Sequence, residues 1–264
     1  MKLGIVTPAY ITQERHDISL AWTYSMALCA EYIPSGLKVK HVIIDDCSPC
    51  GQDIYELYYN YAKHKPNFKV EVIGHTLRYG KWALNRNFLE GISALKDCDF
   101  IISIPDDVII NQHLFEVIKK TYKYLAGNVK AITYFKDVRR DIWGGVSGGQ
   151  FNDWFNYVSC CDGFILLASR ETYTAMIQRV DEKAAEAGHT TMVWRNANNY
   201  LAGYKILEYK ESLAQHIGNS FSAMVGAPRN TERYIYAKDI NLFNKPGVLI
   251  RGKRTEYIPS RSIK

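Results

Sequence analysis

The feature that most constrains the fold is a short apolar run that stops at a proline and is followed by two carboxylates. Residues 100–104 (FIISI) are rich in β-branched side chains, which is typical of a strand buried on both faces of a sheet. Pro105 ends the strand because it has no N–H to donate. Asp106 and Asp107 follow at the carboxyl end, where open α/β sheets bind ligands. The segment predicts a site where carboxylates hold a divalent cation against phosphates, and a solvated Asp-Asp turn is the alternative.

Strand-like and helix-like segments alternate through the first half of the chain, which indicates a mainly parallel, twisted sheet with helices on both faces. The expected strands there are residues 3–7, 39–44, 69–73 and 100–104, and the expected helices are 18–32, 54–62 and 81–95. In the second half we expect helices at 114–125, 170–187 and 191–202, and strands at 130–135, 163–168 and 204–209. We therefore predict an α/β domain over residues 1–226, with residues 227–264 as a basic extension packed on or near the site.

Length and composition suit a globular protein. The chain has 264 residues, of which 47% are apolar, enough for one large α/β domain or two small ones. No stretch approaches the roughly 18 uninterrupted apolar residues of a membrane span. The amino terminus lacks a basic segment followed by an apolar signal core. These features predict a soluble, cytoplasmic protein with no stable membrane insertion.

The six cysteines are too sparse for a disulfide-built fold of this length, so we expect free thiols. Cys47 and Cys50 have the spacing of a redox motif. Together with Cys160 and Cys161 they could supply four thiolates for zinc. Vicinal cysteines are an unusual ligand pair, which makes the zinc or redox interpretation a minor alternative.

The net charge of +6 belongs to the carboxyl-terminal segment. From Arg229 onward, nine Lys or Arg accompany three Asp or Glu, whereas the preceding residues contain 24 of each sign. Aromatic side chains lie between these basic residues. Such a segment could contact nucleic acid, an anionic membrane surface or a phosphorylated donor, and a solvated tail is the alternative.

Residues 143–149 (WGGVSGG) are rich in glycine, which predicts a mobile loop. Beside a ligand site, such a loop could be a lid, and a simple connector is the alternative. The segment does not follow the strand-to-helix pattern of a phosphate-binding glycine loop, so we exclude that interpretation.

Five short motifs follow one another between residues 3 and 222. They are residues 5–10 (IVTPAY), 42–49 (VIIDDCSP), 80–87 (GKWALNRN), the pair Asp106–Asp107, and 215–220 (QHIGNS). In this order they resemble motifs of the GT-A fold nucleotide-sugar glycosyltransferases, most closely the inverting family 2. The resemblance implies a GT-A-like fold and the transfer of a sugar from a nucleotide diphosphate donor.

The resemblance also implies which residues bind the donor. Pro8 and Tyr10 would lie near the nucleotide base, and an acid of the second motif would contact uracil or ribose. The third motif would belong to the donor-binding helix, where a cation stabilises the departing diphosphate. The residues implied to bind the donor are Pro8, Tyr10, Asp45, Asp46, Lys81, Arg86 and Asp106.

The metal ligands implied by the resemblance are Asp107 and His216. Mn²⁺ or Mg²⁺ there would act as a Lewis acid on the leaving diphosphate, and a histidine ligand suits Mn²⁺ better. Three alternatives stay open. In these alternatives the residues have no role in binding: His216 is a structural histidine, Asp45 and Asp46 start a turn, and residues 85–87 form a solvated helix face.

The chain departs from the family pattern in two places. The first acid of the Asp-x-Asp motif aligns with Ile104, which weakens the expected metal site. The segment where inverting members carry a catalytic acid reads GHTTMVW (188–194), without a carboxylate. The remaining candidates for a general base are Asp162, Asp181, Glu182 and His189. Asp162 is favoured because it directly precedes the acceptor-side strand; if none of these is the base, the enzyme would retain configuration.

We therefore expect a glycosyltransferase that acts on a hydroxyl acceptor. The basic tail favours a polyanion, for example DNA that carries hydroxymethylated bases, as modified by bacteriophage enzymes that this chain resembles in size; a viral protein would act in the host cytoplasm. Duplex DNA would require access to a base edge or extrusion of the base. The alternatives are a surface or capsule saccharide as acceptor, or a nucleotide-binding module without catalysis.

Overall fold

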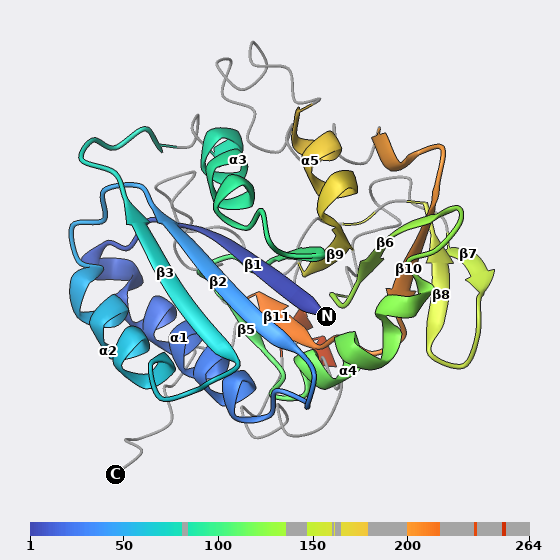
Figure 1. Ribbon diagram of the computed structural model, residues 1–264, viewed down its shortest axis with the longest axis horizontal. Coiled ribbons are helices and arrows are strands. Elements are labelled where there is room, and N and C mark those ends of the chain that lie inside the picture. Colours follow the sequence, from blue (N-terminus) through green and yellow to red (C-terminus); the bar gives the residue numbers. More distant parts are fainter. Residues whose placement is uncertain are drawn as a thin grey trace.

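Among the described residues of this computed structural model, nine strands form one sheet (Figure 1). The structure describes residues 1–80, 84–135, 147–159, 161, 165–178, 200–216, 235–236 and 250–251. The strand order is β3-β2-β1-β4-β9-β6-β10-β8-β7, and all strands except β8 and β9 run in one direction. Their bounds are β1 Lys2–Ala9, β2 Lys38–Asp45, β3 Phe68–Gly74, β4 Phe100–Ser103, β6 Val129–Thr133, β7 Ser147–Gln150, β8 Phe155–Val158, β9 Leu166–Ser169 and β10 Lys205–Tyr209.

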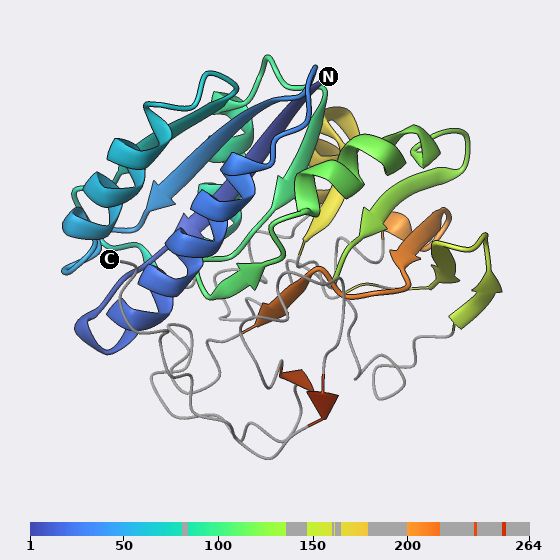
Figure 2. The same cartoon turned by 90° about the horizontal axis from the view of Figure 1, so that it is seen from below.

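Helices cover both faces of this sheet (Figures 1 and 2). The face with the larger apolar cluster carries α1 (His16–Glu31), α2 (Gln52–Ala62) and α4 (Leu114–Thr121). The opposite face carries α3 (Leu84–Ala94) and α5 (Arg170–Gln178). The predicted α/β fold, with a mainly parallel sheet between two helical layers, is therefore confirmed. The expected helix at 114–125 is shorter than predicted, because it ends at Thr121 and continues as the 3₁₀ helix η3 (Tyr122–Tyr124).

Strand β4 is covered on both faces, as its apolar run predicts. Ile101 packs in the cluster that contains α3 and α5, whereas Ile102 packs in the cluster that contains α1 and α2. Both side chains are fully buried. Burial of one such side chain contributes about 1.5–3 kcal/mol, so alternate residues fix the strand between the two helical layers. This packing sets the position of the acid pair that follows the strand.

Close contact between α3 and the sheet requires glycine. A Cβ atom on Gly91 of α3 would overlap the Cγ2 atom of Val6 in β1. On the sheet itself, a Cβ atom on Gly4 would lie 2.8 Å from the Cδ1 atom of Ile101. Absence of these side chains lets α3 approach β1 closely, which places the amino-terminal end of α3 near the carboxyl end of β1.

The glycine-rich segment forms an edge strand where the structure describes it. Residues 143–146 lie outside the described part, but Ser147–Gln150 pair with β8 as β7, so the predicted loop is wrong for 147–149. A Cβ atom on Gly148 would lie 3.0 Å from Cβ of Tyr157, and Gly149 has a φ of +89° where the register shifts. Glycine serves close strand packing and a bulge here.

A small second sheet joins distant segments beside the main one. Strand β5 (Val108–Ile110) pairs antiparallel with β11 (Ala214–His216), and His216 is the register partner of Val108. The sequence did not predict either strand. Each has three residues, which is too short for a periodic pattern.

The described part of the predicted 227–264 extension consists of two short strands. β12 (Ile235–Tyr236) pairs antiparallel with β13 (Ile250–Arg251), and β12 lies against β11. In the described part of the chain, no helix combines the length and apolar character needed to cross a bilayer. The five described cysteines are free, and Cys160 lies outside the described residues.

Candidate functional site

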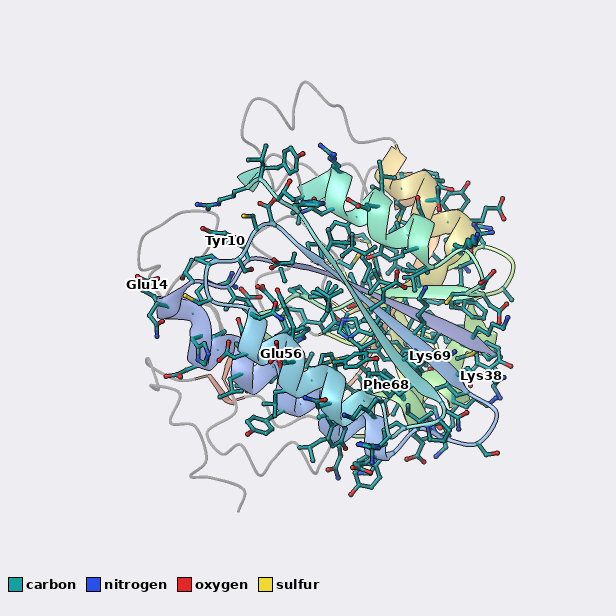
Figure 3. All side chains as sticks on the ribbon, turned by 60° about the vertical axis from the view of Figure 1, so that its left-hand side comes forward. Tyr10, Glu14, Lys38, Glu56, Phe68 and Lys69 are labelled. Carbon is teal, nitrogen blue, oxygen red and sulfur yellow. The ribbon has the colours of Figure 1, made fainter. Side chains whose placement is uncertain are left out.

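The polar residues singled out from the sequence gather at the carboxyl edge of the parallel strands. Ala9, the last residue of β1, pairs with Asp45, the last residue of β2. On its other side β1 pairs with β4, and the main-chain N–H of Ile104 donates to the carbonyl of Val6. Tyr10 and Asp106 therefore follow adjacent strands. Figure 3 shows Tyr10 and Glu14 at this end of the sheet, opposite Lys38 and Lys69.

The acid pair is bound to an arginine that the sequence analysis did not single out. Arg15, the last residue of the 3₁₀ helix η1 (Gln13–Arg15), is only 3% exposed. Its Nη2 atom lies 3.0 Å from Oδ1 of Asp106 and 3.3 Å from Oδ2 of Asp107, and its Nη1 donates to the carbonyl of Tyr10 at 2.8 Å. The main-chain N–H of Tyr10 donates to Oδ2 of Asp106 at 3.1 Å. One guanidinium thus joins the loop after β1 to both carboxylates.

Burial and charge act against each other at this cluster. Burial raises the pKa of the Asp106 carboxyl above its usual range, opposed by Arg15 and reinforced by Asp107. For Arg15, burial works to lower the pKa, but Asp106 and Asp107 outweigh it, so the pKa is raised. The guanidinium therefore stays charged and stabilises the ionised form of Asp106.

The described residues do not form a site that fits a divalent cation. Both oxygens of Asp106 already accept hydrogen bonds, and Arg15 supplies the positive charge between the two acids. Among the residues that the structure describes, no three His, Cys, Asp or Glu side chains form a potential metal cluster, which also applies to Cys47, Cys50 and Cys161. The backbone of His216 lies next to Val108, directly after the acid pair, but its side chain is outside the described part.

Asp45 closes a turn. Its carboxylate accepts hydrogen bonds from the main-chain N–H of Ser48 at 3.1 Å, from the Ser48 hydroxyl, and from the Tyr55 hydroxyl at 2.6 Å. Burial, together with the charge of Asp45, raises the pKa of Tyr55. The geometry agrees with the turn alternative for Asp45, since these three donors already occupy its carboxylate.

Asp46 organises the loop that follows β3. Its carboxylate accepts the main-chain N–H groups of Tyr79 at 2.9 Å and Gly80 at 2.6 Å. Gly80 has a φ of +71°, which glycine adopts without strain. The loop then places the guanidinium of Arg78 3.9 Å from the ring centre of Tyr10. Arg78 could not be singled out from the sequence, because a single arginine in a loop carries no pattern.

A second stacked pair lies beside the first. The guanidinium of Arg86, on α3, lies 4.3 Å from the ring centre of Tyr79. Of the other predicted site residues, Pro8 lies within β1 opposite Ile44, and Lys81 is outside the described residues. All four candidates for a general base also lie outside: Asp162, Asp181, Glu182 and His189. The structure thus brings together most of the predicted donor-binding residues and does not test the base.

A buried chain of hydrogen bonds connects β1 and β2 near the carboxyl edge of the sheet. The Thr7 hydroxyl donates to the carbonyl of Ile104 at 2.5 Å, so it accepts from Nε2 of His41 at 2.8 Å. Nδ1 of His41 then accepts from the Tyr58 hydroxyl at 2.8 Å. Burial lowers the pKa of His41 to about 3, so the imidazole is neutral. The chain ties β1 to the residue that precedes Pro105.

No protein-family model matches the chain, and a search of curated proteins found no match. Among solved structures, S. aureus TarS 1–349 in complex with UDP is similar at 18% identity and a TM-score of 0.47, over 81% of this chain and 60% of that chain. The mannosyltransferase PcManGT from Pyrobaculum calidifontis, in complex with GDP-Man and Mn²⁺, is similar at 15% identity and a TM-score of 0.44, over 80% of this chain and 56% of that chain. The matched region is therefore less than two thirds of either structure's length.

Proposed function

We propose that the chain is a glycosyltransferase that binds a nucleotide diphosphate sugar at the carboxyl edge of its parallel strands. The observation that carries this proposal is the convergence of Arg78, Arg86 and the acid pair at the ends of β1, β2 and β4. Ligands of open α/β sheets bind at this edge, and arginine is suited to planar, bidentate recognition of phosphate. Two exposed guanidinium groups beside aromatic rings suit a ligand with a base and phosphates.

The described residues would have different roles in binding the donor. Tyr10 and Arg78 would bind the nucleotide, with Arg78 and Arg86 on the phosphates. Asp46 would hold the loop that carries Arg78, through its two main-chain hydrogen bonds. The positive charge of Arg15 would offset the negative charge of Asp106 and Asp107. An anionic donor could then approach, whereas two carboxylates without a cation would repel a diphosphate.

Mn²⁺ or Mg²⁺ on Asp107 and His216 remains a prediction. The metal would supply Lewis-acid stabilisation of the leaving diphosphate. The described geometry places Arg15 between the two carboxylates. Asp162 as the general base is likewise a prediction.

For the acceptor, we propose a hydroxyl group on a polyanion, with a hydroxymethylated base of DNA as the specific candidate. Its support is the basic character of residues 229–264 together with the contact of β12, in that segment, with β11 beside the acid pair. A saccharide hydroxyl is the competing acceptor. Transfer assays with hydroxymethylated and unmodified DNA distinguish the two, because a saccharide-specific enzyme modifies neither DNA.

The test of the donor site is calorimetric titration with UDP, GDP and their sugar conjugates, followed by an assay of nucleotide diphosphate release. Arg78→Ala should weaken nucleotide binding about tenfold or more, since it removes a charge-assisted contact of about 1.5–3 kcal/mol. Arg170→Ala is the matched control, because Arg170 is also an exposed arginine. It follows the antiparallel strand β9 and therefore lies at the edge of the sheet opposite the proposed donor site. Equal affinities in wild type and Arg78→Ala would refute the donor site, and binding without turnover would indicate a nucleotide-binding module.

A further inference from the structure

A row of basic side chains runs along the edge of the sheet opposite the proposed donor site. Each strand from β3 to β10 in the sheet order, except β4, contributes one Lys or Arg at or next to its end on this edge. In sheet order they are Lys69, Lys38, Lys2, Arg170, Lys130 and Lys205. Parallel strands begin at this edge, and antiparallel β9 ends there, directly before Arg170. We call these six residues the amino-edge row.

The row is a product of the fold. Its members come from positions 2 to 205, and the sequence before Arg229 has no net charge. Register nevertheless places Lys2 directly opposite Lys38, and Lys69 opposite Lys40. Figure 3 shows Lys38 and Lys69 together at one end of the sheet and Tyr10 at the other. Asp45 ends β2 at the opposite edge, Asp46 follows it, and Asp106 and Asp107 follow β4. The amino edge therefore gathers lysines from separate strands, whereas the acids of the carboxyl edge lie beside Arg15, Arg78 and Arg86.

The charges of the row are available to a partner. Five of the six side chains are exposed and Lys130 is half-buried. None of the six forms an ion pair with a described residue, in contrast to Lys40, which pairs with Glu71. Acids also lie along this edge: Asp97 and Asp99 precede β4, where the row is interrupted, and Glu171 directly follows Arg170. Asp99 accepts the main-chain N–H of Lys2.

Tyrosines accompany the lysines at the far end of the row. The ammonium group of Lys205 lies 4.9 Å from the ring centre of Tyr157, and that of Lys130 lies 5.6 Å from the ring centre of Tyr204. Tyr204 is 38% exposed. Cation–π contacts of this kind hold an ammonium group in place without neutralising its charge. The lysines therefore keep their charge for an external anion.

The geometry points to an interaction surface for the phosphodiester backbone of a nucleic acid along the amino-edge row. Strands are spaced about 4.8 Å apart, so the six interstrand steps from β3 to β10 give a row roughly 30 Å long. That length covers about nine base pairs of duplex at about 3.4 Å each. A line of cations along one edge of the sheet fits a linear polyanion better than a flat membrane surface, which would engage a broad face. This surface does not depend on the donor site.

The experiment measures binding of a short labelled DNA duplex by fluorescence anisotropy over a range of salt concentrations. Two double variants remove charge from the two ends of the row: Lys38→Gln with Lys69→Gln, and Lys130→Gln with Lys205→Gln. Each should weaken binding at fixed salt and reduce the slope of log K against log salt by about two, since each lysine accounts for about one. The control double variant is Lys120→Gln with Lys210→Gln, in which Lys120 is paired with Glu116 and Lys210 follows the other end of β10. It should bind as wild type does.

The proposal is overturned if neither row variant changes the salt slope, or if the control variant changes it equally. Binding to phosphatidylserine vesicles without binding to DNA would also overturn it, in favour of a membrane surface. Thermal unfolding checks that each variant is folded. Nucleotide titration of the same variants should match wild type. Failure of nucleotide binding in every protein would refute the proposed function alone and leave the DNA result standing.

Discussion

The guanidinium of Arg15 lies 3.0 Å from Oδ1 of Asp106, although the two residues are 91 positions apart in the sequence. Both side chains are buried, and the same guanidinium reaches Asp107 and the carbonyl of Tyr10. Its Nε atom is buried without a hydrogen-bond partner among the described residues. The pair therefore links the first turn after β1 to the turn after β4, and the site depends on it both for charge and for shape.

Replacement of Arg15 by methionine should strongly destabilise the protein. Removal of one partner leaves Asp106 as a buried, uncompensated charge, which typically costs about 3–5 kcal/mol. Denaturant unfolding at neutral pH measures this loss. The double variant Arg15→Met with Asp106→Asn should recover part of it, because no buried charge remains. A double variant that is less stable than Arg15→Met would contradict the charge argument and leave packing as the cause.

Asp46→Asn should weaken nucleotide binding by about tenfold or more while it changes little of the core. The amide can accept at one oxygen only, so one of the two main-chain N–H groups at Tyr79 and Gly80 loses a charged acceptor worth about 1.5–3 kcal/mol. Calorimetric titration with nucleotide measures the effect. Asp53→Asn is the control, because Asp53 is exposed on α2 and bonds His16. Equal affinities for the two variants would show that the loop does not contribute to binding.

Gly91→Ala should destabilise the protein by about 1–3 kcal/mol, the usual cost of overpacking. Alanine favours a helix over glycine by up to about 1 kcal/mol, so a loss of stability would have to come from the overlap with Val6. Denaturant unfolding gives the difference. Gly203→Ala is the control, since its new methyl group would meet no atom within 4 Å and its backbone is not in the left-handed region. Stabilisation by Gly91→Ala would mean that α3 lies further from the sheet.

The main strands could be predicted from the sequence because a strand that is buried on both faces of the sheet is a continuous apolar run. Residues 39–44 and 100–104 are apolar runs, and they are found within β2 and at β4. The position of the acids at one edge could also be predicted, since the carboxyl ends of parallel strands lie at the same edge of the sheet. Asp46 and Asp106 were predicted for that reason.

Contacts between residues that are far apart in the sequence could not be predicted, because they produce no local pattern. Arg15 stands among polar residues before α1, and only the folded chain places it against Asp106. Arg78 faces Tyr10 because Asp46 holds the loop that carries Arg78. The glycines at 148 and 149 look like a loop in sequence, yet edge pairing with β8 overrides that preference. The amino-edge row is likewise invisible until strand register aligns its members.

The neutral His41 should make the protein lose stability in acid between pH 6.5 and about 3. Its pKa falls from 6.5 to about 3 on folding because the ring is fully buried. Below pH 6.5 the unfolded chain therefore binds a proton that the folded chain does not, and stability falls by about 1.4 kcal/mol per pH unit; above pH 6.5 the contribution is flat. Unfolding free energies of wild type and His41→Asn, measured across this range, isolate the effect.

In that comparison, His41→Asn should be less stable at pH 7, because Thr7 and Tyr58 lose a matched partner. Its stability should nevertheless fall less steeply with acid than that of wild type, so the two curves approach each other as the pH drops. His64→Asn is the control, since it removes an exposed histidine that lies outside the Thr7–His41–Tyr58 chain. Parallel curves for wild type and His41→Asn would mean that His41 gains its proton in the folded protein as easily as in the unfolded chain, which the closed chain from Thr7 to Tyr58 does not allow.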